Sequence, residues 1–375
     1  MTKKPKNKLR IGLVVPHIFL HRDILPHVIF SPGHLAVALA DGLQKLGADV
    51  TLFTPGPVET LAINVTADLG LFEQELVGRG DSYLDLLKKH PFTFVTLARQ
   101  VQAEIIAKAY AADLDIVHVY TNEEDTALPF AKLSKNPVVF THHDPFNFLV
   151  KYKNVFPKYA DLNWISLSKA QRVGMPENTN WVANIYHGLE RTKLQPLVEP
   201  TKDYFAYLGR IIETKGLHLA IEAAKKAGVT LKIAGKHYSG KKDVYWQNVI
   251  EPQLGNGVEY VGFLKTDAEK QTFLGNAKAL LVPSTFNEPF GMVSIEALAC
   301  GTPVIGLDVG ATQEIVEDGK TGFIVGKGNA VKGLVKSIQQ VDKLNRSGCR
   351  QSFEDCFTLD RMCQEHLNLY EQLIK

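Results

Sequence analysis

The stretch that decides the fold reads IGLVV over residues 11–15, HLAVALADGLQKL over 34–46 and DVTLF over 49–53. The outer two segments are short and almost continuously apolar, which is typical of strands buried on both faces of a parallel sheet. The middle segment has apolar residues at helical spacing, and Gly47 ends it. Together they predict one strand–helix–strand unit of a parallel sheet.

The same alternation continues along the first half of the chain. Further strands are expected at 116–120, 137–141 and 162–166. A polar stretch with Pro196 and Pro200 then interrupts the pattern. We therefore expect a first Rossmann-like domain over residues 1–190.

Strands and helices alternate again after this break. Strands are expected at 205–208, 230–234, 258–261, 279–282, 303–306 and 322–325, with helices over 211–226 and from about 292. This predicts a second Rossmann-like domain over 191–356, and a helix over 357–375 that packs back toward the first domain. The expected fold class is α/β, with two doubly wound domains facing each other across a cleft, where the carboxyl ends of the strands hold ligands.

Composition narrows the class of protein. A chain of 375 residues with 45% hydrophobic and 22% charged side chains is an ordinary globular protein. Its net charge of +2 argues against a dedicated nucleic-acid binder. No signal peptide, membrane-spanning run or Cys-x-x-Cys spacing is evident, and the cysteines read as reduced packing residues. We expect a cytoplasmic protein with at most peripheral membrane contact.

The densest cluster of polar residues is EPFGMVSIE over 288–296. It follows a predicted buried strand and opens a predicted helix, so free N–H groups near Gly291 can receive an anion. Glu288 and Glu296 frame this helix start. The alternative reading is a helix-capping Glu288 and a solvated Glu296.

A second cluster is LGRIIETKG over 208–216. Arg210 and Lys215 lie between a buried strand and the next helix, where two cations beside a helix start form a diphosphate clamp. The alternative is a pair of surface cations with Gly216 as a helix-entry glycine.

These motifs resemble those of the family 4 retaining glycosyltransferases of the GT-B fold. The resemblance rests on Gly209-Arg210 with Lys215-Gly216, on Glu288-Pro-Phe-Gly with Glu296, and on Cys300-Gly-Thr-Pro-Val304. It spans nearly the whole chain, although the first half matches mainly in layout.

The resemblance implies metal-independent transfer of a sugar from a UDP- or GDP-linked donor to an acceptor hydroxyl, with no cofactor besides the donor substrate. In this family pattern Arg210 and Lys215 bind the diphosphate, Glu288 faces the sugar hydroxyls and Glu296 binds the ribose. The acceptor is unspecified among saccharides, lipids and small metabolites.

The resemblance also implies His143 as the catalytic residue of the first domain. His142 is its direct rival, whereas His118 lies within an apolar strand and is expected in the core. Donor contacts are further implied for Gly33, Gly209, Gly262, Phe263, Phe290, Gly291, Met292 and Val293.

Three positions depart from the family pattern. A single Gly33 follows the stretch 16–32 in place of a Gly-Gly pair, Gly235-Lys-His237 replaces Gly-x-Gly, and His187 precedes Gly188 in place of Asn. None of them removes the clamp residues or the two glutamates.

Other functions fit the sequence less well. A nucleotide-sugar epimerase or hydrolase of the same fold and a non-catalytic nucleotide-sugar-binding protein are the alternatives. A dinucleotide dehydrogenase is disfavoured because no Gly-x-Gly-x-x-Gly follows 11–15. Asp113-Leu-Asp115 precedes a buried strand and is not read as a metal site.

Overall fold

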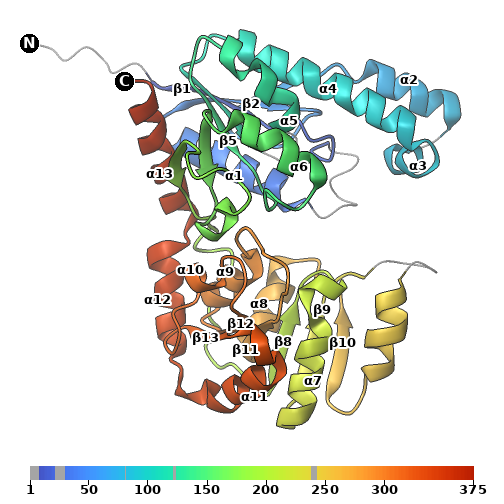
Figure 1. The fold of residues 1–375 in the computed structure, drawn as a ribbon, viewed down its shortest axis with the longest axis vertical. Helices are drawn as coiled ribbons and strands as arrows, with labels where there is room; N and C mark the ends of the chain where they lie inside the picture. Colours follow the sequence, from blue (N-terminus) through green and yellow to red (C-terminus); the bar gives the residue numbers. More distant parts are fainter. Residues whose placement is uncertain (1–7, 22–29, 81, 121–123, 238–242) are drawn as a thin grey trace, which may run out of the picture. The chain divides into compact units, whose positions relative to one another are not determined.

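The computed structural model describes residues 8–21, 30–80, 82–120, 124–237 and 243–375. The chain divides into two compact units. Unit 1 consists of Met1–Leu167, Arg172–Ile185 and Met362–Lys375, and unit 2 consists of Ser168–Gln171 and Tyr186–Arg361. Each unit is built on one sheet flanked by helices (Figure 1).

Unit 1 contains a parallel sheet of seven strands in the order β3-β2-β1-β4-β5-β6-β7. The strands are β1 (Arg10–Val14), β2 (Asp49–Thr54), β3 (Ile63–Thr66), β4 (Ile116–Tyr120), β5 (Val138–Thr141), β6 (Asn163–Ser166) and β7 (Trp181–Asn184). The α-helices are α1 (Ser31–Lys45), α2 (Gly70–Arg79), α3 (Tyr83–Lys89), α4 (Pro91–Ala111), α5 (Glu124–Ala127) and α6 (Val150–Val155). The strand order reverses between β1 and β4, as in doubly wound folds.

Unit 2 contains a parallel sheet of six strands in the order β10-β9-β8-β11-β12-β13. The strands are β8 (Tyr204–Leu208), β9 (Leu231–Ala234), β10 (Val258–Gly262), β11 (Ala277–Val282), β12 (Val304–Leu307) and β13 (Gly322–Val325). The α-helices are α7 (Leu217–Ala227), α8 (Asp267–Gly275), α9 (Met292–Ala299), α10 (Thr312–Ile315), α11 (Ala330–Gln340) and α12 (Arg346–Cys356). Two doubly wound α/β units confirm the predicted fold class.

Apolar periodicity explains these elements. Ile11, Leu13 and Val14 of β1 are fully buried, as expected for a central strand covered on both faces. On α7 the buried residues include Leu217, Ala220, Ile221 and Ala224, which recur at the spacing of one helical face. Burying each leucine or isoleucine side chain contributes about 1.5–3 kcal/mol.

Some predicted boundaries are wrong. The helix expected over 211–226 begins at Leu217, because Gly216 adopts the left-handed conformation at φ 70° and interrupts it. The first helix begins earlier than predicted, at Ser31, with Pro32 in its first turn, where proline fits. Strands β3 and β7 were not predicted, because both are short and only partly buried or exposed.

The last helix, α13 (Leu359–Leu373), contributes its residues from Met362 onward to unit 1. There the Tyr370 hydroxyl lies 2.6 Å from His118 Nδ1, and the His366 ring stacks on His118. His118 is completely buried, and this burial lowers its pKa well below the usual value. It is the core histidine that its apolar strand predicts.

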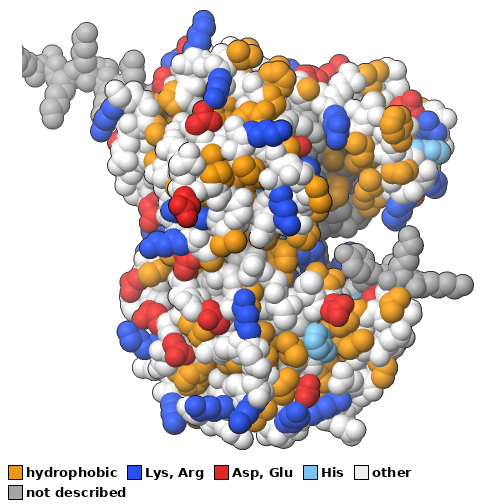
Figure 2. Space-filling view, in the orientation of Figure 1, with side chains coloured by type: hydrophobic (Ala, Val, Ile, Leu, Met, Phe, Trp, Pro, Cys, Tyr) orange, Lys and Arg blue, Asp and Glu red, His pale blue; other side chains and the backbone are white. Residues whose placement is uncertain are grey.

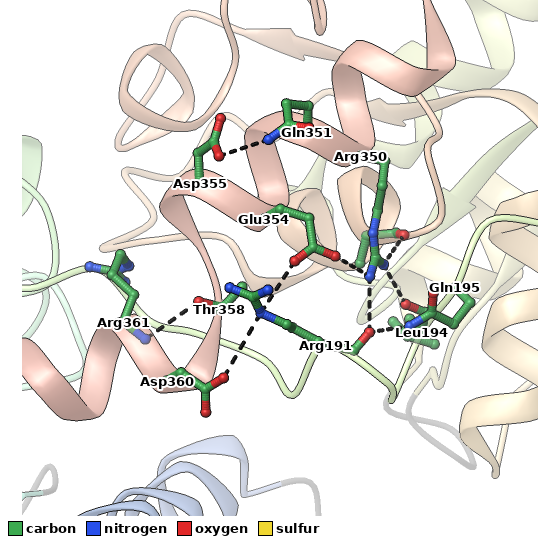
Figure 3. Close-up of polar contacts among 11 residues, drawn as sticks. Arg191, Leu194, Gln195, Arg350, Gln351, Glu354, Asp355, Thr358, Asp360 and Arg361 are labelled. Carbon is green, nitrogen blue, oxygen red and sulfur yellow. Dashed lines mark hydrogen bonds and ion pairs between the residues drawn. The ribbon is translucent and has the colours of Figure 1, made fainter. Parts of the chain in front are cut away.

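The segment that precedes β8 is bound to α12 within unit 2 (Figure 3). Arg350 donates hydrogen bonds to the carbonyl oxygens of Leu194 at 2.8 Å and Arg191 at 3.0 Å. Arg191 in turn pairs with Glu354 at 3.3 Å. The proline-containing stretch is therefore an ordered part of unit 2.

Surface features bear on two further predictions. Cys300, Cys349 and Cys363 are buried, but Cys356 is exposed at the end of α12, so the packing prediction is wrong for that residue. Hydrophobic side chains remain exposed over α2–α4, including Val77 at 83% and Phe92 at 85% (Figure 2). Within the described ranges, no helix has the length and hydropathy required to cross a bilayer.

Candidate active site

The loops after β8, β9 and β10 are joined at one edge of the sheet in unit 2. Gly209 N–H donates to Ala234 O at 3.1 Å, and Gly235 N–H donates to Gly262 O at 2.9 Å. A Cβ atom at residue 235 would lie 1.9 Å from Gly209 O, so only glycine permits this approach. The structure thus places the predicted donor residues Gly209 and Gly262 at the ends of β8 and β10, on either side of β9. Phe263 follows Gly262 with 49% of its surface exposed.

The two predicted polar clusters meet in this unit. Thr285 N–H donates to Thr214 O at 2.9 Å, which joins the loop after β11 to the loop after β8. Lys215 Nζ lies 2.5 Å from Glu288 Oε1, and their side chains are 19% and 16% exposed. Residues 73 positions apart therefore form a largely buried ion pair.

Arg210 lies on the same loop as Lys215. Its side chain is exposed and forms no ion pair with any residue that the structure describes. The Tyr207 hydroxyl donates to the Arg210 carbonyl at 3.0 Å and fixes the main chain there. The guanidinium is available to an anionic ligand.

A third segment holds the main chain of Glu288. Ala311 N–H donates to Glu288 O at 3.2 Å. Gly310 has φ 57°, and a Cβ atom there would lie 2.4 Å from Glu288 O. Glycine at 310 is thus required for the carboxylate-bearing loop to pack as it does.

Helix α9 begins directly after this loop. Gly291 precedes it with φ 105°, and no side chain caps the helix start. The amides of Met292 and Val293 lie in this first turn, where helix N–H groups have no intrahelical acceptor. Phe290 is 4% exposed, and its ring packs against other aromatic side chains. Its ring is therefore closed to a ligand, and a donor contact at this residue would use the main chain.

Glu296 lies one and a half turns into α9 and is 9% exposed. Lys270 of α8 extends its Nζ to 2.8 Å from Glu296 Oε1. The lysine neutralises a carboxylate that would otherwise be costly to bury. Glu296 is therefore not the solvated helical residue that the alternative reading expected.

The two rival histidines of unit 1, His142 and His143, differ in how deeply they are buried. His142 is completely buried among aromatic rings, its Nδ1 lies 3.1 Å from Glu124 Oε2, and burial lowers its pKa to about 4. His143 is only partly buried, with its ring 4.6 Å from that of Tyr120. Of the two, His143 is the less buried.

Gly33 lies in the first turn of α1 and is buried. A Cβ atom there would lie 2.6 Å from the Phe30 ring, so close packing accounts for glycine at this position. Part of the preceding stretch, residues 22–29, lies outside the described residues.

The histidines at the other two departures from the family pattern, His237 and His187, both pack against aromatic rings. The His237 ring stacks on Trp246 at 4.1 Å, and its Nδ1 lies 2.6 Å from Asp243 Oδ2. His187 is 4% exposed and packs against the Phe290 ring. Both histidines therefore have structural contacts next to the predicted donor residues.

Asp113 and Asp115 both pair with Arg10. Asp115 also accepts a hydrogen bond from the Arg10 main chain at 2.8 Å. The Asp-x-Asp sequence thus pairs with the first residue of β1.

Comparison with known proteins identifies the class. The family model described as glycosyl transferases group 1 matches residues 190–351, and that of glycosyltransferase family 4 matches residues 33–176. The chain belongs to the family 4 glycosyltransferases of the GT-B fold and is a glycosyltransferase.

Individual relatives agree with this assignment. The O-antigen chain mannosyltransferase C of Escherichia coli is 24% identical over 90% of this chain and 93% of its own. The structure of sucrose-phosphate synthase from Thermosynechococcus elongatus is similar at a TM-score of 0.74 and 18% identity, covering 98% of this chain and 99% of that one. The structure of Anabaena HepE in complex with UDP is similar at a TM-score of 0.69 and 18% identity, covering 97% and 100%.

Sequence reasoning missed two contributors to this site, Lys270 and Trp246. Lys270 is 26 residues from Glu296 and belongs to no motif, so only the packing of α8 beside α9 reveals it. The contact of Gly310 with the Glu288 main chain likewise follows only from the fold.

Gly216→Ala should destabilise unit 2 more than Gly228→Ala. Both glycines have similar φ values, 70° and 67°, but a Cβ at 216 would lie 2.0 Å from Pro283 O, whereas 228 is open. The shared left-handed conformation costs about 1–2 kcal/mol, and only residue 216 adds a backbone clash. Thermal unfolding of both variants measures the difference, and equal midpoints would contradict this account.

Proposed function

We propose that this glycosyltransferase is retaining and metal-independent, and that it transfers a hexose from a UDP- or GDP-linked donor to an acceptor hydroxyl. The observation that carries the proposal is the Lys215–Glu288 pair, which joins the two motifs on the loop that also holds the exposed cation of Arg210. The likeness to HepE, solved in complex with UDP, supports a nucleotide-linked donor.

The two cations supply the electrostatics of bond cleavage. Negative charge grows on the diphosphate as the glycosidic bond breaks, and preorganised donors at that position lower the barrier. Arg210 offers a fork that suits phosphate oxygens, and Lys215 offers a compact ammonium. Two side-chain cations at the leaving group support the proposed metal independence.

Glu288 and Lys215 change partners when the donor binds. Without a ligand the ammonium compensates the carboxylate. In the proposed complex the ammonium turns to the diphosphate, and the carboxylate accepts hydrogen bonds from two sugar hydroxyls. Glu296, held by Lys270, accepts from the ribose hydroxyls.

The proposed reaction retains the anomeric configuration. The acceptor hydroxyl attacks the anomeric carbon from the face that the diphosphate leaves, so one carbon–oxygen bond breaks and another forms on that face. A leaving phosphate oxygen takes the hydroxyl proton. His143, which is only partly buried in unit 1, contacts the donor sugar in this proposal. Saccharides, lipids and small metabolites are all candidate acceptors.

Replacing either member of the central pair should abolish activity. We expect Lys215→Ala and Glu288→Gln each to lower turnover at least about 100-fold, while the surface control Lys226→Ala keeps it. Donor hydrolysis and transfer to an acceptor panel, measured in EDTA, provide the readout, and thermal unfolding confirms that the variants fold. Unchanged turnover in either variant would contradict the mechanism.

The anomeric configuration tests the stereochemical part of the proposal separately. NMR of the product formed from an α-linked donor should show an α-linkage. A β-linked product would show an inverting enzyme and rule out same-face attack.

Lys270 should position Glu296 for ribose recognition. Lys270→Met removes the partner of a nearly buried carboxylate, so we expect nucleotide affinity to fall about tenfold, with Lys270→Arg recovering part of it. Lys278→Met, which removes an exposed ion pair, is the control. The preference for UDP or GDP over the 2′-deoxy nucleotide should shrink in Lys270→Met, and an unchanged preference would refute this positioning role.

A further inference from the structure

A groove lies on unit 2 between β13 and one face of α11. Its volume is about 620 Å³, within the range of small-molecule sites. None of its lining residues belongs to the candidate active site described above. On the helix side they include Lys332, Lys336 and Ser337, which the helical repeat places on one face.

The charge in the groove is mainly positive. Lys332 and Lys336 are one turn apart, exposed, and form no ion pair with any residue in the described part of the chain. Their Cβ atoms are about 5–6 Å apart at this spacing, so both ammonium groups can reach one anion. Lys and Arg side chains gather along this end of unit 2, over α7 and α11 (Figure 2).

The groove also contains a hydroxyl group. Ser337 lines the groove and is 8% exposed. Its hydroxyl can donate one hydrogen bond and accept others. A ligand hydroxyl in the groove can therefore pair with Ser337.

Backbone geometry favours a small ligand over an added strand. β13 is the edge strand of its sheet, and two of its main-chain groups are already bonded outside the sheet. Asp318 accepts from Ile324 N–H at 2.9 Å, and Gly319 N–H donates to Gly322 O at 2.8 Å. A partner strand would have to displace both bonds.

The helix start completes the polar lining. Asn329 precedes α11 without a side-chain cap, so the first-turn amides at this end of the groove lack an intrahelical acceptor. Gly333 brings α11 close to β13, since a Cβ atom there would lie 2.3 Å from Val325 Cγ1. The groove is therefore a built concavity with cations, amides and a hydroxyl along one side.

We propose that this groove binds a phosphate monoester of a small polyol, such as a hexose phosphate. The phosphate binds Lys332, Lys336 and the start of α11, and a ligand hydroxyl pairs with Ser337. This site is independent of the proposed donor site, because it shares no residue with the Arg210–Lys215 clamp.

Calorimetric titration of the full chain with glucose 6-phosphate, inorganic phosphate and glucose tests the proposal. We expect saturable binding of glucose 6-phosphate that weakens at least tenfold in Lys332→Ala/Lys336→Ala. The charge-matched control Lys225→Ala/Lys226→Ala should bind normally. Ser337→Ala, which favours the helix, should weaken glucose 6-phosphate binding while leaving that of inorganic phosphate unchanged.

The donor clamp can also attract phosphates, so Arg210→Ala is titrated as well. Normal binding of glucose 6-phosphate in Arg210→Ala supports the separate groove. Binding lost in Arg210→Ala but kept in Lys332→Ala/Lys336→Ala would assign the anion to the clamp and overturn the proposal. Absence of saturable binding to the wild-type chain would overturn it too.

Discussion

Backbone contacts that only glycine permits hold the loops of unit 2 at the carboxyl ends of its strands. Gly216 lies against the carbonyl of Pro283, Gly235 against that of Gly209, and Gly310 against the main chain of Glu288. Each contact is closer than any side chain allows. Parallel strands bring these loops to one edge, and the glycines let them touch, so side chains far apart in sequence converge there.

The Lys215–Glu288 pair depends on that convergence. Exposed ion pairs contribute little, but this pair is more than four-fifths buried, and removing one partner would leave a largely desolvated charge. A pair of this kind is also ready to exchange partners, because a diphosphate satisfies the ammonium and sugar hydroxyls satisfy the carboxylate. The same contact thus stabilises the site and holds in place the groups that bind the proposed donor.

The sequence was sufficient to predict the fold class and most strands, because buried parallel strands and amphipathic helices have strong periodic patterns. It could not place the start of α7, since the left-handed turn at Gly216 overrides the apolar pattern upstream. The presence of Arg210, Lys215, Glu288 and Glu296 together in unit 2 was also predictable, because they lie within compact motifs. Their roles toward a donor stay predictions. The Lys270–Glu296 pair, the His237–Trp246 stack and the burial of His142 were not, because each depends on tertiary packing between separate elements.

The central claim is that a cationic clamp in unit 2 binds a nucleoside diphosphate without metal. Calorimetric titration of UDP, GDP and ADP in EDTA into the wild-type chain and Arg210→Ala tests it most directly. The account predicts that one nucleotide binds with a Kd on the order of micromolar and at least tenfold more weakly in Arg210→Ala. Absence of binding by all three, or equal affinity in the variant, would contradict it.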